Sequence, residues 1–261
     1  MHHISFNASE DRRRSLAALG TIVGEGFVAI DVDEADPRWP NIETWMKAHG
    51  VTDTVYTEFS NDEISRARWL KLVGTWNYGY PQPDEENMGF LQATYDLSAG
   101  CSKCKLPLKQ KAPFQIRGEP KWGRRGIFQL NWVFDEYFVK PEVWASVFKP
   151  FGVGSRAVLN RKGQELKTVV QLVSNSPEVD FDTTGLTFEV CDRCGCKRYQ
   201  PDYRGPFPPL LQELSGVMVR TKQYFGGNTF KGVLVSQELA RKLISENIRG
   251  VSFKPVAERE D

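Results

Sequence analysis

Two Cys-x-x-Cys pairs constrain the fold of this chain more than any other feature of its sequence. They are Cys101/Cys104 in "CSKC" and Cys191/Cys194 in "CDRCGC". Each pair lies between strand-like segments, as in a zinc knuckle, a tight turn that directs two thiolates at one point. Gly195 after the second pair allows the backbone amides to curl toward sulfur. Since tetrahedral zinc needs four ligands, we expect the two knuckles to meet and bind one zinc ion.

A redox pair and unmetallated thiols are the alternative interpretations. A thioredoxin-like pair would stand where a strand leads into a helix, whereas "KRYQPDYRGP" after the second pair is not helical. Free structural cysteines usually lie singly on apolar faces, not in polar turns. The fifth cysteine, Cys196, is either a spare thiol or an alternative ligand to Cys194. A complete four-cysteine site has no open coordination position, so its expected role is structural and not catalytic.

The rest of the sequence predicts a mixed α/β fold in two parts. Residues 1–90 read as an N-terminal α/β part, and residues 91–261 as a second α/β part that contains the zinc ribbon. The boundary is the loop "GTWNYGYPQPDEENMG", which is rich in glycine, proline and aromatic residues. In the first part we expect a helix over Asn41–Gly50, and a capping box formed by Ser60 and Glu63 that opens a second helix.

Two later segments share one pattern. "EYFVKPEVWASVFKPFG" and "GVLVSQELARKLISENIRG" each join a short apolar strand to a helix with an apolar stripe, and the second is followed by the strand "VSFKPV". We therefore expect two strand–helix–strand units with the four-cysteine zinc-ribbon element between them. Such units commonly look alike, so the pattern alone does not establish a duplication.

Composition and motifs favour a non-enzyme. The hydrophobic content of 40% and charged content of 26% are those of an ordinary globular protein, and a net charge of +1 provides no general attraction for nucleic acid or anionic membranes. The N-terminus lacks the apolar core of a secretory signal, so we expect a cytoplasmic protein with reduced thiols. His2 and His3 are expected to fray at the N-terminus, and His49 ends a helix. The sequence contains no phosphate-binding, dinucleotide-binding, zinc-protease or nucleophile-elbow motif.

Two segments are candidate binding surfaces. One is the aromatic loop around Trp76, and the other is the basic segment 109–126, in which cationic and aromatic side chains alternate. Such residues anchor protein partners and also bind nucleic acid. The alternatives are a loop fixed to the core by its rings and a solvated hairpin. The candidate partner-binding residues are Trp76, Tyr78, Tyr80, Trp122, Arg124 and Arg125.

The two Cys pairs, "PFPPLLQEL" and the C-terminal "VLVSQELARKLISENIRGVSFKPV" resemble the double-CXXCG-motif proteins of myxobacteria and related families. The resemblance covers mainly the C-terminal 170 residues, and Lys105 stands where that family has glycine after its first pair. It implies a structural zinc ion, no catalytic residue, and an immunity protein that neutralises a toxin by direct binding. The alternative is a zinc-ribbon module that contacts nucleic acid through residues 109–126.

Overall fold

The computed structural model describes residues 1–84, 88–200, 204–226 and 230–259. They form two compact units: Met1–Glu58 with a short segment at Arg204 and Gly205, and the remainder from Phe59 onward. The division therefore lies at residue 58, not at the predicted residue 90. The reason is that strand β4 (Trp69–Gly74) is an interior strand of the largest sheet of the second unit.

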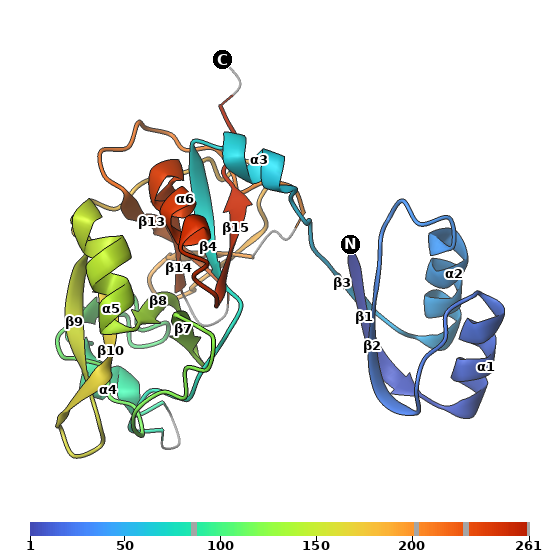
Figure 1. Cartoon of the computed structure of the whole chain (residues 1–261), viewed down its shortest axis with the longest axis horizontal. Helices are drawn as coiled ribbons and strands as arrows, with labels where there is room; N and C mark the ends of the chain where they lie inside the picture. Colours follow the sequence, from blue (N-terminus) through green and yellow to red (C-terminus); the bar gives the residue numbers. More distant parts are fainter. Residues whose placement is uncertain (85–87, 201–203, 227–229, 260–261) are drawn as a thin grey trace. The chain divides into compact units, whose positions relative to one another are not determined.

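The first unit is a small antiparallel sheet with two helices. Its sheet has the order β2-β1-β3, and α1 and α2 pack against one face of it (Figure 1). The elements are β1 (His2–Ala8), α1 (Glu10–Ala18), β2 (Gly26–Val32), α2 (Trp39–His49) and β3 (Asp53–Val55). The predicted helix that ends at Gly50 is confirmed, because α2 ends there with Gly50 in the left-handed region at φ 62°.

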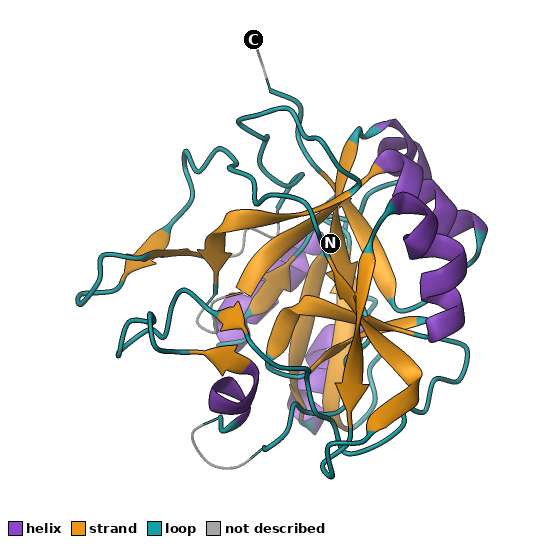
Figure 2. Ribbon diagram, turned by 90° about the vertical axis from the view of Figure 1, so that its left-hand side faces the viewer, coloured by secondary structure: helices purple, strands orange, loops and turns teal. Residues whose placement is uncertain are grey.

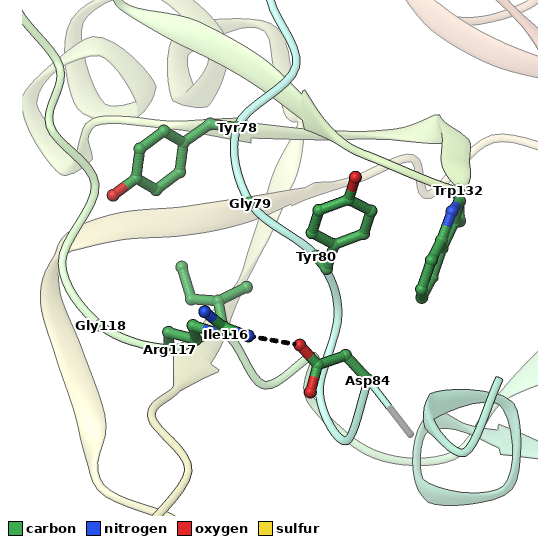
Figure 3. Close-up of a pocket in the computed structure, with 8 residues that line it drawn as sticks. All are labelled: Tyr78, Gly79, Tyr80, Asp84, Ile116, Arg117, Gly118 and Trp132. Carbon is green, nitrogen blue, oxygen red and sulfur yellow. Dashed lines mark hydrogen bonds and ion pairs between the residues drawn. The ribbon is translucent and has the colours of Figure 1, made fainter. Parts of the chain in front are cut away.

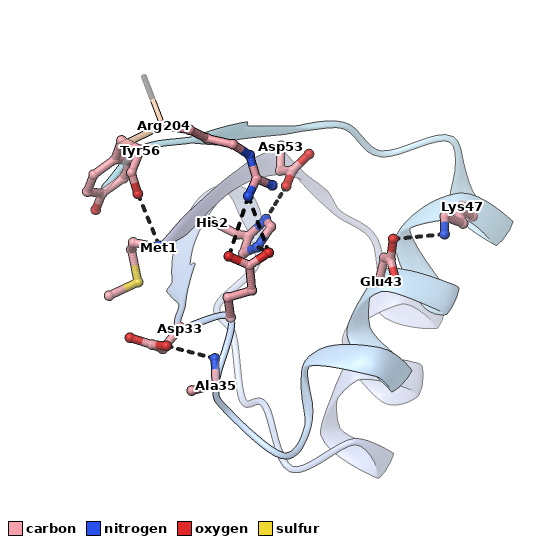
Figure 4. A network of polar contacts seen from close by, with 10 residues as sticks. Met1, His2, Asp33, Ala35, Glu43, Lys47, Asp53, Tyr56 and Arg204 are labelled. Carbon is pink, nitrogen blue, oxygen red and sulfur yellow. Dashed lines mark hydrogen bonds and ion pairs between the residues drawn. The ribbon is translucent and has the colours of Figure 1, made fainter. Parts of the chain in front are cut away.

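His2 and His3 do not fray, contrary to the expectation from the sequence. They lie in β1, the central strand, because its alternating apolar residues make it the core of this sheet. His2 is 3% exposed, and its ring stacks on the Trp39 ring. Its Nδ1 lies 2.5 Å from a carboxylate oxygen of Asp53 (Figure 4). The N-terminus of the chain is thus part of the folded structure.

The second unit is built mainly of strands (Figure 2). A six-stranded sheet has the order β11-β12-β13-β14-β4-β15, a four-stranded sheet the order β7-β8-β10-β9, and β5 pairs with β6. The strands besides β4 are β5 (Tyr95–Asp96), β6 (Lys109–Gln110), β7 (Ile127–Leu130), β8 (Val133–Val139), β9 (Gly154–Leu159), β10 (Glu165–Val173), β11 (Phe188–Val190), β12 (Lys197–Tyr199), β13 (Met218–Phe225), β14 (Phe230–Ser236) and β15 (Val251–Pro255). The helices are α3 (Asn61–Arg66), α4 (Phe90–Thr94), α5 (Pro141–Val143) and α6 (Gln237–Ser245); α5 continues as a π-helical stretch, Trp144–Phe148, and a 3₁₀ turn, Lys149–Phe151.

The mixed α/β class is confirmed, and so is the capping box, in which Ser60 and Glu63 satisfy each other's backbone N–H groups at the start of α3. Of the helices in the described part of the chain, none is long and apolar enough to cross a membrane. The two strand–helix–strand segments are β8–α5–β9 and β14–α6–β15. In neither segment do the two strands pair with each other: β10 lies between β8 and β9, and β4 between β14 and β15.

The same succession of parts occurs twice in the second unit. A strand, a Cys-x-x-Cys turn, a β-hairpin, a helix and a final strand follow one another first from β4 to β9 and then from β10 to β15. The opening strand of each succession lies in the sheet of the other, because β4 joins β14 and β15 while β10 joins β8 and β9. The first Cys pair thus precedes the first strand–helix–strand segment, and only the second pair stands between the two segments. The two halves are interlocked by strand exchange.

A shared hydrophobic core lies beneath both helices. Leu72 on β4, Val139 on β8 and Leu172 on β10 are at most 1% exposed, and they belong to the same cluster as Val147 and Leu243 from the helical segments. α5 and α6 lie beside each other over this core (Figure 1). Residues from both sheets and both helical segments thus share one hydrophobic cluster.

Candidate metal centre

Four cysteines of the second unit converge on one point. The Sγ atoms of Cys101, Cys104, Cys191 and Cys194 all lie within 4.8 Å of one another. Cys101 Sγ is 3.9 Å from Cys191 Sγ, and Cys104 Sγ is 3.5 Å from Cys194 Sγ. With Zn–S bonds of about 2.3 Å, the edges of a tetrahedron of four sulfurs around zinc are about 3.8 Å long. The four thiols therefore fit a tetrahedral metal ion of the size of zinc.

The two turns have the same backbone hydrogen bonds. The N–H of the residue after each pair donates to the carbonyl of the first cysteine: Lys105 to Cys101, and Gly195 to Cys191, both at 2.8 Å. The N–H of each first cysteine donates in return to the carbonyl five residues later, at 2.9 Å. Lys105 and Gly195 both have positive φ, 63° and 72°. Lys105 thus adopts the conformation that glycine adopts in the second turn.

Backbone N–H groups of the two turns favour the anionic form of the first cysteine of each pair. The backbone N–H groups of Cys104 and Lys103 lower the pKa of Cys101 to about 6. Those of Arg193 and Cys194 likewise lower the pKa of Cys191. The anionic thiolate is the form that binds metal, so the amides of each turn stabilise a metal ligand.

The second cysteine of each pair behaves differently. Burial raises the pKa of Cys104. The N–H of Cys196 lowers the pKa of Cys194, but burial and hydrogen bonds with the neighbouring cysteines outweigh it and raise this pKa to about 12. The first cysteine of each pair thus ionises more readily than the second, and a divalent cation would favour the anionic form of all four.

The fifth cysteine and the exposed residues at the tips of the two turns contribute less to the site. Cys196 is outside the group of four, and its Sγ lies 3.7 Å from the carbonyl of Lys197. An ion pair of 2.6 Å between Lys103 and Asp192 joins the tips of the two turns. This exposed pair adds little stability by itself, but it joins the same two segments as the cysteines.

The predicted partner-binding residues have different positions. Tyr80 is 42% exposed, Arg124 and Arg125 are exposed, and Trp76 and Tyr78 are half-buried. Trp122 is only 8% exposed, and its Nε1 donates to the carbonyl of Thr168 at 3.0 Å. Its assignment as a surface anchor is therefore corrected: the ring packs in an aromatic cluster with Trp76 and Phe128.

The basic segment 109–126 is attached to the core along its length. Phe114 is fully buried, and Glu119 accepts hydrogen bonds from the N–H groups of Lys167 and Thr168 at 2.7 and 3.1 Å. Because Phe114 and Trp122 point inward, the segment offers neither ring for stacking on nucleic-acid bases. The aromatic side chains of this segment therefore do not support nucleic-acid binding.

One association was not visible in the sequence. The aromatic loop and the basic segment lie together, since Gln82 N–H donates to the carbonyl of Gln115 at 2.7 Å and the Arg125 guanidinium lies 4.7 Å from the Trp76 ring centre. Trp132, which the sequence reasoning did not single out, extends the same surface with its ring 4.6 Å from that of Tyr80. Its position after β7, at the turn of a hairpin, was the available signal.

Comparison with protein-family models and with curated proteins gives no match.

Proposed function

We propose that this chain is a non-enzymatic binding protein, built on a structural zinc site, that neutralises a toxin by binding it directly as an immunity protein does. The zinc ion would be held by Cys101, Cys104, Cys191 and Cys194 in a ribbon-like element that joins the two interlocked halves. Four thiolates leave no coordination position for a substrate, which supports a scaffolding role. The family resemblance supplies the toxin as the class of partner.

The observation that carries this proposal is a continuous surface formed by the aromatic loop and the basic segment. We call it the aromatic–arginine surface, and it consists of Trp76, Tyr78, Tyr80, Arg117, Arg125 and Trp132. Tyr78, Tyr80, Arg117 and Trp132 surround an open pocket of roughly 460 Å³ whose floor includes Ile116 (Figure 3). Aromatic rings and arginine side chains around a pocket are typical of the residues that dominate binding energy at protein interfaces.

The surface is held in shape before any partner arrives. Arg117 forms an ion pair with Asp84 at 2.8 Å (Figure 3). Arg161 pairs with the other oxygen of the same carboxylate at 3.1 Å. Tyr78 N–H donates to the carbonyl of Gln129 on β7 at 2.9 Å, which attaches the loop to the sheet. A rigid surface loses little conformational entropy on binding, so more of the contact energy appears as affinity.

The distribution of histidine also supports a binding role. All three histidines belong to the first unit, whereas the metal centre and the aromatic–arginine surface belong to the second. Histidine is the usual general base near neutral pH. Neither place in the second unit has one.

The experiment is co-expression of the chain with the products of its adjacent genes, followed by co-purification and a growth assay. We expect a complex and relief of toxicity, and we expect the double variant Tyr80→Ala/Arg125→Ala to weaken both at least tenfold. Leu211→Ala is the matched control, since Leu211 is 48% exposed and lies outside the surface. The proposal is wrong if no neighbour forms a complex or is neutralised, or if the chain turns over a substrate.

A further inference from the structure

Two pockets of the second unit meet at Asp135 on β8. A polar pocket of roughly 220 Å³ lies against Glu136 and Arg220. A mainly apolar pocket of roughly 280 Å³ lies against Trp132 and Phe230. Three residues line both pockets: Tyr95, Leu108 and Asp135. The carboxyl group of Asp135 thus lies at the boundary between the apolar pocket and the polar pocket.

Four charged side chains that line the polar pocket with Asp135 are already paired with one another. Both oxygens of Glu136 accept hydrogen bonds from Arg220, at 2.7 and 2.6 Å, and one of them also accepts from Gln171 at 2.7 Å. The ammonium group of Lys231 forms an ion pair with Glu178. Arg220 and Lys231 are therefore committed to other carboxylates, whereas Arg156 lines the polar pocket as a further cation.

Asp135 itself has only a neutral partner in the described part of the chain. One of its oxygens accepts the backbone N–H of Lys231 at 3.1 Å, and it forms no ion pair there. The Asp135 side chain is half-buried, and Glu136 is its neighbour in sequence. Burial is the larger cause and the negative charge of Glu136 the smaller one that raise the pKa of Asp135 to about 6. A half-buried carboxylate that lies beside a second carboxylate and has no cation of its own destabilises the free protein. The same arrangement favours binding of a cationic ligand.

The geometry points to a binding site for a small amphipathic amine, with its ammonium group on Asp135 and its apolar body against Trp132 and Phe230. The aromatic faces add attraction for the cation, and the apolar walls disfavour a strongly hydrated inorganic ion. Three cationic side chains also line the apolar pocket, and each has a partner of its own. Lys103 is paired with Asp192 and Arg198 with Glu189, and Lys105 Nζ donates to the backbone carbonyl of Ser102 at 2.9 Å. This site shares Trp132 with the aromatic–arginine surface, but its argument does not depend on the proposed partner binding.

Isothermal titration calorimetry with three compounds of similar shape tests the site: 2-phenylethylamine, 2-phenylethanol and phenylacetate. We expect the amine to bind with a millimolar or lower Kd, and the alcohol and the acid to bind at least tenfold more weakly. Asp135→Asn should reduce amine binding at least tenfold, since it keeps the shape and removes the charge. Asp182→Asn is the control, because Asp182 lines neither pocket.

Loss of binding in Asp135→Asn counts only if the variant folds, which its thermal melting and zinc content report. Equal binding of amine and alcohol would overturn the role of charge. Tighter binding of phenylacetate would show that Arg156, which lines the polar pocket, holds the head group instead. Undetectable binding of the amine to the wild-type chain, or unchanged binding to Asp135→Asn, would likewise overturn the inference.

Discussion

Cys104 Sγ lies 3.5 Å from Cys194 Sγ, and ninety positions separate the two residues in the sequence. They are the second cysteines of their pairs, and the first cysteines, Cys101 and Cys191, face each other in the same way at 3.9 Å. Equivalent positions of the two successions thus meet at the candidate metal centre. The centre therefore links the two interlocked halves at a position that their strand exchange has already brought together.

Removing one ligand of the centre should destabilise the whole second unit. We expect protein purified without added metal to contain about one zinc per chain by elemental analysis. Cys191→Ser should lose the metal and lower the free energy of unfolding by about 3–5 kcal/mol, because it removes a cross-link that closes a long loop. Cys196→Ser is the matched control and should keep its zinc. A metal-free chain of unchanged stability would contradict the site.

Lys105 should carry a measurable backbone cost. Its φ of 63° is unfavourable for a residue with a Cβ, so Lys105→Gly should raise the free energy of unfolding by about 1 kcal/mol. Gly195→Ala should lower it by a similar amount, because a Cβ there contacts nothing within 4 Å and only the backbone strain remains. Chemical denaturation of the two variants in zinc-containing buffer measures both effects; shifts of the same sign would refute the equivalence of the turns.

Trp122→Ala should destabilise the protein by about 3–5 kcal/mol, because it leaves a cavity in the aromatic cluster and removes the hydrogen bond to Thr168. Arg124→Ala, two residues away on the exposed side, should change the free energy of unfolding by less than about 0.5 kcal/mol. Thermal and urea denaturation compare the two. Near-equal stabilities would place Trp122 at the surface after all.

Asp135→Asn should stabilise the protein at neutral and alkaline pH. The folded-state pKa of about 6 is higher than the ordinary value of 3.8, so the carboxyl contributes stability when protonated, and that stability is lost as pH rises from about 4 to about 6. Two pKa units correspond to about 3 kcal/mol at most, and partial solvent access to the side chain makes about 1–3 kcal/mol our expectation at pH 8. At pH 3.5 the two proteins should be nearly equally stable. A stabilisation that is independent of pH would argue against ionisation of Asp135 as its cause.

Sequence alone determined the features that depend on local chemistry. The Cys-x-x-Cys spacing predicted which four cysteines lie close enough to hold a metal ion, since a tight turn is enough to place two thiol groups side by side. Ser60 and Glu63 predicted their capping box, and Gly50 predicted the end of α2, because these interactions span only a few residues. The mixed α/β class followed from the apolar patterns of single segments.

Only the tertiary structure decided which segments adjoin. The apolar pattern of β4 marks a strand but not its neighbours, so its place between β14 and β15, and with it the boundary at residue 58, could not be read from the chain. Trp122 has neighbours of high charge in sequence, yet its ring is buried because contacts with Trp76 and Phe128 come from elsewhere in the fold. The junction of two pockets at Asp135 likewise arises from strands far apart in sequence. The sequence indicates which side chains are apolar enough to be buried and which can bind a metal ion. The residues that each of them contacts depend on how segments far apart in the chain pack together.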